Sequence, residues 1–167
     1  MPLSEIVFRL GERNDLSQII RLLADDSFSG DLESAQDVST DRIPTAYQQA
    51  WEAVVASEEN QILVAADGMQ VIAVLQLTMI PSLTLRGSRR AQIEGVRVAS
   101  VYRGQGVGTQ LMQWAIDLAK KENCLLVQLT MDRRRERAVS FYRRLGFVAS
   151  HEGFKMQLDR QEGSGNG

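Results

Sequence analysis

The first part of the chain alternates apolar and polar residues in a pattern that predicts a strand followed by a helix. Residues 5–11 (EIVFRLG) alternate with a period of two, which is typical of a half-buried strand. Residues 14–26 change to helical spacing, and Asp15 and Gln18 are spaced like a capping box at the helix start. The expected buried stripe of this helix is Leu16, Ile19, Ile20 and Leu23.

The next part predicts a second helix and a hairpin. Residues 25–42 are polar and rich in turn formers, so they are expected to connect elements rather than to form one. Two apolar runs flank Asp67-Gly68 within residues 61–80, which is a strong hairpin signal. A helix fits residues 43–57, and its apolar stripe would be Tyr47, Trp51, Val54 and Val55.

The second half predicts strands and helices in alternation. Residues 81–90 are a loop or a strand extension, and the strand that follows, 91–100, contains Gly95. A glycine inside a strand indicates a bulge or a close backbone approach. A helix is expected over 106–121, burying Val107, Leu111, Met112, Ala115, Leu118 and Ala119. The last expected elements are a buried strand over 125–131, a helix over 136–146 closed by Gly146, and short strands over 147–150 and 154–158.

Composition favours a single globular domain. The 167 residues are 44% hydrophobic and 24% charged, so we expect one domain over 1–160 and a disordered tail over 161–167. The net charge of −2 gives no support for nucleic acid or an anionic membrane as a partner. The N-terminus lacks a signal-peptide pattern and no apolar run approaches membrane-spanning length, so a cytoplasmic location is expected.

The chain has one cysteine and one histidine, which narrows its chemistry. A lone Cys124 excludes an internal disulfide and a cysteine-rich zinc site, and we expect it to pack within the fold. A histidine-based metal centre or a Ser-His-Asp triad would depend on His151. We interpret His151 as a surface residue between the last two strands, and we expect no metal.

Three glycines alternate in RGQGVGT (103–109), between a predicted strand and a predicted helix. Small residues at such a junction let backbone N–H groups converge on an anion, and the helix N-terminus and Arg103 add positive potential. A diphosphate is the expected ligand, although a tight turn without a ligand would use the same glycines. The ATP-binding pattern fails because no lysine follows Gly108, and the dinucleotide pattern fails at Thr109.

The loop fits a third pattern better. Its first six residues, RGQGVG, match [RQ]-x-x-G-x-[GA] and resemble the acyl-CoA diphosphate loop of the GNAT superfamily of N-acetyltransferases. The segments EGVRVASVYRGQGVGTQLMQWAIDLAKKE and LTMDRRRERAVSFYRRLGF resemble the same family, and with the hairpin they cover residues 61–158. The resemblance implies an α/β fold with a central mixed sheet of about six to seven strands, flanked by about four helices.

The resemblance implies that acetyl-CoA is the acyl donor and lies between two strands that part at a bulge. The pantetheine arm would bond to backbone groups of Val96 and Val98, and a backbone N–H near Val96 would polarise the thioester carbonyl. Asp132 stands where many relatives carry asparagine, so it can accept a hydrogen bond from the arm but cannot donate one. The residues expected to contact the donor are Val96, Arg97, Val98, Arg103, Gly104, Gln105, Gly106, Val107, Gly108, Thr109, Asp132 and Tyr142.

The resemblance also implies direct attack of an amine on the thioester in a ternary complex, without an acyl-cysteine. An alkyl amine of pKa about 10 must lose a proton before it attacks, and Glu94 is the candidate base. Tyr142 in FYRRLGF matches the family's tyrosine that protonates the leaving thiolate. Each has an alternative: Glu94 could be a polar residue on an exposed strand face, and Tyr142 a core aromatic residue.

The acceptor is less well indicated. Arg86, Arg89 and Arg90 favour an acceptor with a carboxylate or phosphate. The connection before the second helix favours a cationic acceptor, unless its acidic residues only face solvent; they are Asp25, Asp26, Asp31, Glu33, Asp37 and Asp41. A run of arginines could face the CoA phosphates or form a solvated helix start: Arg133, Arg134, Arg135 and Arg137.

Three functions therefore stay open. A small-molecule amine is favoured as the acceptor, and an N-acetyltransferase of proteins or peptides is the first alternative. A regulatory module that binds acetyl-CoA without turning it over is the second, and such a module needs neither Glu94 nor Tyr142. A homodimer is also open, because dimers are common in families of this kind.

Overall fold

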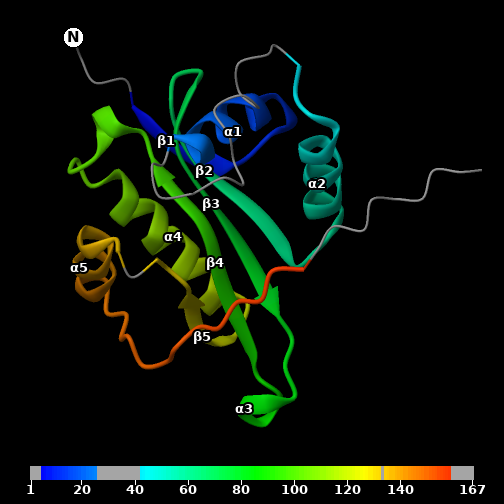
Figure 1. The fold of residues 1–167 in the computed structure, drawn as a ribbon, viewed down its shortest axis with the longest axis vertical. Helices are drawn as coiled ribbons and strands as arrows, with labels where there is room; N and C mark the ends of the chain where they lie inside the picture. Colours follow the sequence, from blue (N-terminus) through cyan, green and yellow to red (C-terminus); the bar gives the residue numbers. More distant parts are fainter. Residues whose placement is uncertain (1–4, 26–41, 133, 159–167) are drawn as a thin grey trace, which may run out of the picture. The chain divides into compact units, whose positions relative to one another are not determined.

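The computed structural model describes residues 5–25, 42–132 and 134–158, and the chain divides into two compact units, Met1–Asp132 and Arg133–Gly167. The described part of the first unit is built around a five-stranded sheet in the order β1-β2-β3-β4-β5 (Figure 1). Its strands are β1 (Ile6–Leu10), β2 (Asn60–Asp67), β3 (Gln70–Ile80), β4 (Arg89–Val98) and β5 (Cys124–Leu129). Neighbours are antiparallel except β4 and β5, which are parallel, so the predicted mixed sheet of an α/β fold is confirmed.

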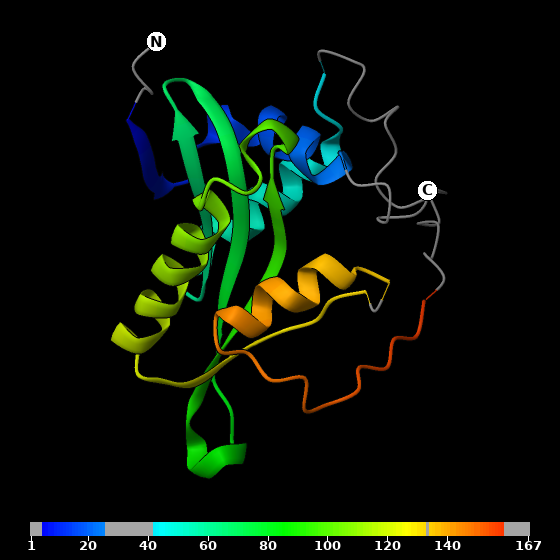
Figure 2. The ribbon, with the colours of Figure 1, turned by 90° about the vertical axis from the view of Figure 1, so that its left-hand side faces the viewer.

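Helices cover both faces of this sheet. Figure 2 shows α4 against one face and α1 and α2 against the other. The helices of the first unit are α1 (Leu16–Ala24), α2 (Thr45–Ala56), the short α3 (Thr84–Gly87) at the tip between β3 and β4, and α4 (Val107–Lys121). The second unit contributes α5 (Glu136–Arg144). In the described parts of the chain, the four longer helices confirm the predicted number of about four.

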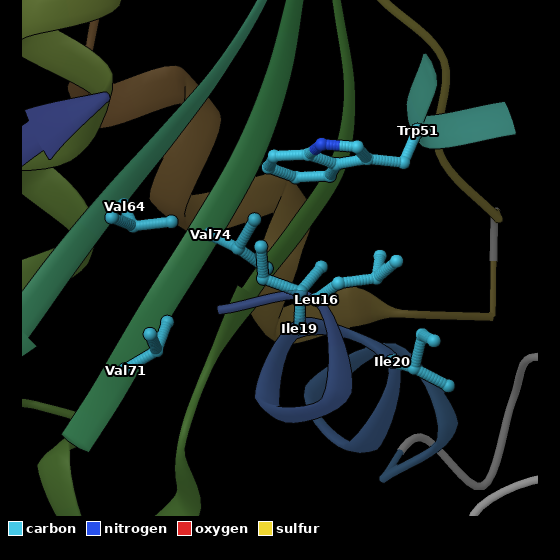
Figure 3. Close-up of a cluster of buried hydrophobic side chains, with 7 residues drawn as sticks. All are labelled: Leu16, Ile19, Ile20, Trp51, Val64, Val71 and Val74. Carbon is cyan, nitrogen blue, oxygen red and sulfur yellow. The ribbon is translucent and has the colours of Figure 1, made fainter. Parts of the chain in front are cut away.

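The core follows the predicted apolar stripes. On the face of α1 and α2, a cluster of buried side chains joins both helices to β2 and β3 (Figure 3): Leu16, Ile19, Ile20, Trp51, Val64, Val71 and Val74. On the other face α4 buries Val107, Leu111, Met112, Ala115 and Ala119 as expected, and Leu118 is half-buried. Removal of this apolar surface from water is the main stabilising term for a domain of this size.

An ion pair lies at the junction between β1 and α1. Asp15 is 5% exposed, and its carboxylate accepts hydrogen bonds from both terminal nitrogens of Arg9, at 2.6 and 3.0 Å. It also accepts from the Glu12 backbone N–H at 2.7 Å. The predicted capping box of Asp15 with Gln18 is therefore wrong, because the Gln18 amide instead contacts Met69 and Val71 in the hairpin between β2 and β3.

Two predictions of burial are also corrected. On α2, Trp51 is buried but Val54 is only half-buried and Val55 is exposed, so the expected stripe is narrower than predicted. The strand β5 was expected to be buried, yet Leu125 is 61% exposed. The physical reason is that, among the described strands, β5 ends the order of the sheet, and an edge strand has a neighbour on one side only.

The two short strands predicted at the end of the chain do not form. Residues 147–150 and 154–158 are irregular, and Phe154 is 92% exposed. Alternation of apolar residues makes a strand only where a neighbouring strand accepts its backbone hydrogen bonds. The described residues therefore hold five strands rather than the expected six to seven.

Replacement of Asp15 by asparagine is expected to lower the free energy of unfolding by about 2 kcal/mol at pH 7, because it removes the charge from a partly buried bidentate pair. The Arg9 guanidinium, which donates to this carboxylate, holds the pKa of Asp15 below its ordinary value. A group of lowered pKa stabilises the fold above its ordinary pKa, and this stabilisation is lost as the pH falls through the lowered value. Urea denaturation should thus show the gap between wild type and Asp15→Asn closing in acid.

The matched control for this experiment is Asp117→Asn on α4. Asp117 is exposed, and its side chain accepts hydrogen bonds from Gln113 and Lys120. A surface change of this kind should shift the unfolding free energy by less than about 0.5 kcal/mol. Equal losses in the two variants would contradict a special role for the Arg9–Asp15 pair.

Candidate functional site

The strand β4 is bent by a bulge at Gly95. The register runs from Gln76 opposite Glu94 to Val74 opposite Arg97, so two residues of β4 lie opposite Leu75 alone. Gly95 has φ of +62°, a left-handed conformation that is unfavourable for residues other than glycine. The predicted bulge is confirmed. A Cβ at Gly95 would lie 3.4 Å from Leu23 of α1, so the bulge lies beneath the end of that helix.

The bulge lies where β4 and β5 part. The parallel pairing covers only Arg89–Ile93 of β4 and ends where Ile93 lies opposite Leu129. Beyond Ile93, β4 continues for five residues paired with β3 alone. Figure 2 shows the two strands diverging from their common end. In the described part of the chain, this edge of β4 has no strand beside it.

The backbone groups of Val96 and Val98 point to this edge. The Ala99 N–H donates to the Ile72 carbonyl of β3 at 2.8 Å, and backbone groups of successive strand residues point to opposite sides. Val98, and Val96 two residues before it, therefore direct their groups away from β3. Two guanidinium groups reach the same carbonyls: Arg97 donates to Val96 at 3.0 Å, and Arg103 Nε donates to Val98 at 2.9 Å.

The glycine loop follows this strand directly. A 3₁₀ turn at Ser100–Tyr102 leads from β4 to Arg103 and the loop, and α4 begins at Val107. Gly106 is the N-cap of α4 with φ of +85°, and Gly104 has φ of +78° with open space where a Cβ would point. The first turn of α4 holds no acidic side chain. The predicted strand–glycine loop–helix junction is confirmed, and its form suits a diphosphate, because an anion could approach the backbone N–H groups at the helix start.

Side chains hold the loop in place from both ends. The Tyr102 hydroxyl donates to Asp67 at 2.7 Å, which ties the 3₁₀ turn to the hairpin between β2 and β3. This bond raises the pKa of Tyr102, because the phenolate would lie beside the Asp67 carboxylate. At the other end, the Gln105 amide donates to the Val101 carbonyl at 2.7 Å. The loop is therefore fixed by contacts within the first unit.

Glu94 lies immediately before the bulge and is exposed. Its neighbours on the same face of the sheet are uncharged polar residues. Asn60, Thr78, Gln92 and Gln128 lie directly opposite one another on β2, β3, β4 and β5, and we call them the polar row. Thr78 donates to Asn60 at 2.7 Å, and Gln128 donates to Gln92 at 2.7 Å. Gln76, which is paired with Glu94, donates to Asn60 at 3.2 Å.

Sequence reasoning missed the polar row. Its signal was present in the alternation of Gln76 with Thr78 and of Gln92 with Glu94, but the row exists only once four strands are placed in register. Sequence reasoning also missed what Arg89 does. Arg89, the first residue of β4, pairs with Glu59 just before β2 and, at 3.5 Å, with Glu122 just after α4, at the closed end of the sheet.

Tyr142 belongs to the second unit. It lies on α5, and its ring meets those of Phe141 and Phe147 edge to face, with centroids 5.1 and 5.9 Å apart. Gly146, with φ of +93°, follows the helix as predicted. The structure places Glu94 and Val96–Val98 on β4 of the first unit, with the glycine loop directly after that strand, whereas their joint role and the place of Tyr142 beside them stay predictions.

Other predicted residues are only partly described. Asp132, the last residue of the first unit, is half-buried, and Arg134, Arg135 and Arg137 lie around the start of α5. Arg133 and all of the acidic connection except Asp25 lie outside the described residues. Their contribution to the site stays a prediction.

Cys124 packs within the first unit, and His151 lies on the surface. Cys124 is half-buried with its Sγ 3.5 Å from Met79 Sδ, and burial raises the pKa of its thiol. His151 is exposed beside Ser150, on irregular chain rather than between two strands. Within residues 5–25, 42–132 and 134–158, there is no group of three His, Cys, Asp or Glu that could hold a metal ion. No helix in that part of the chain is long and apolar enough to cross a membrane.

Comparisons with known proteins agree with this geometry. The model of the acetyltransferase (GNAT) family matches residues 17–147. An uncharacterized N-acetyltransferase of Methanocaldococcus jannaschii is 40% identical over 57 residues, which are 34% of this chain and 25% of that protein. N-alpha-acetyltransferase 30 of Schizosaccharomyces pombe is 39% identical over 64 residues, 38% of this chain and 40% of that protein. The matches thus span less than half the length of these curated relatives.

A solved structure is similar over a much longer stretch. The crystal structure of a transcriptional regulator from Bacillus halodurans is 42% identical, with a TM-score of 0.87. The similarity covers 92% of this chain and 100% of that one.

Replacement of Gly95 by alanine is expected to cost about 1–2 kcal/mol of unfolding free energy, because a Cβ strains the left-handed conformation. Gly68→Ala is the matched control, since Gly68 has φ of +58° in the turn between β2 and β3. Both variants should lose similar stability in urea denaturation. Only Gly95→Ala should shift the amide resonances of Val96–Val98. A neutral Gly95→Ala would contradict the bulge.

Proposed function

Because the chain belongs to the acetyltransferase (GNAT) family, we propose that it transfers the acetyl group of acetyl-CoA to a primary amine of a small molecule. The observation that carries this proposal is the edge of β4 that opens at Gly95 and leads without interruption into the glycine loop and α4. Such an edge can take up an extended arm, and the loop can take up the diphosphate at the end of that arm.

The donor site uses mainly the backbone. Backbone groups of Val96 and Val98 would pair with the pantetheine arm as a strand pairs with its neighbour, while Arg97 lies between them on β4. The N–H groups of Gln105, Gly106, Val107, Gly108 and Thr109 would hold the diphosphate, assisted by Arg103 and the conformation of Gly104. Acetyl-CoA supplies the thioester when bound. A fixed N–H near Val96 would stabilise the negative charge that develops on the thioester oxygen.

Proton transfer needs two further groups. Glu94 would take a proton from the acceptor ammonium, directly or through one water, so that the free amine can attack. Tyr142 would give its proton to the sulfur as the bond between sulfur and the acetyl carbon breaks. Direct attack then leaves an amide and a thiol, and the approximation of both substrates supplies much of the rate.

The polar row supports a polar acceptor. Asn60, Thr78, Gln92 and Gln128 offer uncharged donors and acceptors beside Glu94, which suits a hydroxylated or amide-bearing amine. Arg89 is taken by Glu59 and Glu122, which weakens the case for an anionic acceptor. Peptide N-termini stay a second candidate, because the fission yeast relative is named as an N-alpha-acetyltransferase.

The proposal is tested by calorimetry with acetyl-CoA and by thiol release with glucosamine, spermidine and short peptides as acceptors. Binding of acetyl-CoA together with turnover of at least one amine is expected. Binding without turnover on any amine would favour a module that only binds the donor. Failure to bind acetyl-CoA would overturn the proposed function.

Glu94→Gln is expected to lower kcat by about 100-fold with little change in the KM for acetyl-CoA, because the loss concerns a proton transfer. The remaining rate should rise with pH up to the pKa of the acceptor amine, since only free amine then reacts. Steady-state kinetics from pH 6 to about 9.5 measure both effects. Glu52→Gln, at an exposed position of α2, is the control. Unchanged rates in Glu94→Gln at every pH would remove Glu94 as the base.

Tyr142→Phe is expected to lower kcat by about tenfold or more, because the thiolate then leaves without a proton donor. The phenylalanine keeps the ring contacts with Phe141 and Phe147, so the fold of the second unit should persist. Tyr47→Phe, on α2, is the matched control. An equal effect of the two variants, or a loss of melting temperature in place of rate, would assign Tyr142 to packing.

A further inference from the structure

The Arg103 side chain folds back onto the strand that precedes it. Its Nε donates to the Val98 carbonyl, five residues earlier, at 2.9 Å. A peptide carbonyl accepts hydrogen bonds best near its own plane, which at Val98 means along the edge of β4. The guanidinium therefore lies across the edge that opens beyond Ile93.

The bond at Val98 has a counterpart at Val96. Arg97 donates to the Val96 carbonyl at 3.0 Å, so both outward carbonyls of this edge are held by cations of the chain itself. The two arginines differ in origin. Arg97 belongs to β4, whereas Arg103 belongs to the glycine loop and is exposed. Only Arg103 can therefore turn from β4 toward a ligand at the start of α4.

Arg103 and an arm that pairs with β4 compete for the same carbonyl, that of Val98. A bidentate contact with a phosphate uses two parallel N–H groups of the guanidinium and directs its plane toward the anion. The bond from Nε to Val98 places the guanidinium at the edge of β4, where the arm would pair, so an arm that binds there has to displace it. An arm that pairs with β4 needs the Val98 carbonyl at the same time as its diphosphate arrives at the loop.

We propose that Arg103 is a specificity-determining residue that holds the Val98 carbonyl until a diphosphate draws it away. The inference rests on the proposed donor site. When a thioester that carries the diphosphate displaces Arg103 from Val98, Arg103 gains a charge-assisted contact with the diphosphate at the loop, and this contact compensates for the lost bond. A pantetheine thioester without phosphates displaces Arg103 with no such contact. Arg103 therefore selects CoA thioesters over phosphate-free pantetheine thioesters.

The experiment compares the binding of acetyl-CoA and of S-acetylpantetheine, which lacks the nucleotide and all phosphates. Isothermal titration calorimetry is applied to the full chain as wild type, Arg103→Leu and Arg103→Lys. Arg103→Leu should bind acetyl-CoA about tenfold more weakly, because it loses a charged hydrogen bond to phosphate. The same variant should bind S-acetylpantetheine about two- to tenfold more tightly, because the competitor for Val98 is gone.

Arg103→Lys separates the two roles. Lysine keeps a positive charge for the phosphates but has no guanidinium, and therefore no Nε–H to donate to Val98. It should bind acetyl-CoA within about threefold of wild type and S-acetylpantetheine more tightly than wild type. The dependence of acetyl-CoA affinity on salt should weaken in the leucine variant and persist in the lysine variant.

The outcomes decide between the inference and its premise. The inference is overturned if acetyl-CoA still binds but Arg103→Leu binds S-acetylpantetheine no more tightly than wild type does. Undetectable binding of S-acetylpantetheine by both proteins counts as this outcome. Wild type failing to bind acetyl-CoA would overturn the proposed function itself. The matched control is Arg13→Leu, since Arg13 contacts Gln48 on α2, away from β4, and should leave both affinities unchanged.

Discussion

The left-handed turn at Gly95 decides where the sheet opens, and the rest of the site depends on it. Before the turn, β4 pairs with β3 on one side and β5 on the other; after it, β3 alone remains. The same bend sets the direction in which the chain leaves β4 for the glycine loop, and it lies under Leu23 of α1. Any residue with a Cβ would have a strained backbone conformation at this position. The opening therefore depends on glycine, which has no Cβ, rather than on a side-chain contact.

Side-chain contacts hold β4 and the glycine loop in place at both ends of the open edge. At the closed end, Arg89 joins the start of β4 to Glu59 and Glu122, so β4 and α4 are held where β5 still pairs. At the open end, Tyr102 and Asp67 join the glycine loop to the hairpin of β2 and β3. The open edge of β4 thus lies between two ends that are each held by side-chain contacts. A site that must accept a long flexible arm benefits from such fixed walls, because less order has to be imposed when the arm binds.

The elements that could be predicted from the sequence are those whose signal is local. Asp67-Gly68 marks the hairpin, Gly95 the bulge, and the glycines of 103–109 the start of α4, because each residue type itself permits the backbone found there. What could not be predicted depends on partners distant in sequence. Arg89 meets Glu59 thirty residues away, the polar row needs four strands in register, and the exposure of β5 follows from its place at the edge. After residue 146 the sequence predicted strands that do not form, because alternation of apolar residues is not sufficient without a neighbouring strand.

The strands β3 and β4 have two faces with separate duties. Leu77, Met79, Ala91 and Ile93 are buried on the face of α4, whereas Gln76, Thr78, Gln92 and Glu94 occupy the other face of the same strands. Exchange of a residue on the second face leaves the packing of the first intact. The proposed contacts with the donor rely mainly on backbone groups, which every residue type except proline supplies in full. Under the proposed function, such an arrangement would let the acceptor change by substitution at a handful of positions, while the fold and the contacts with the donor are kept.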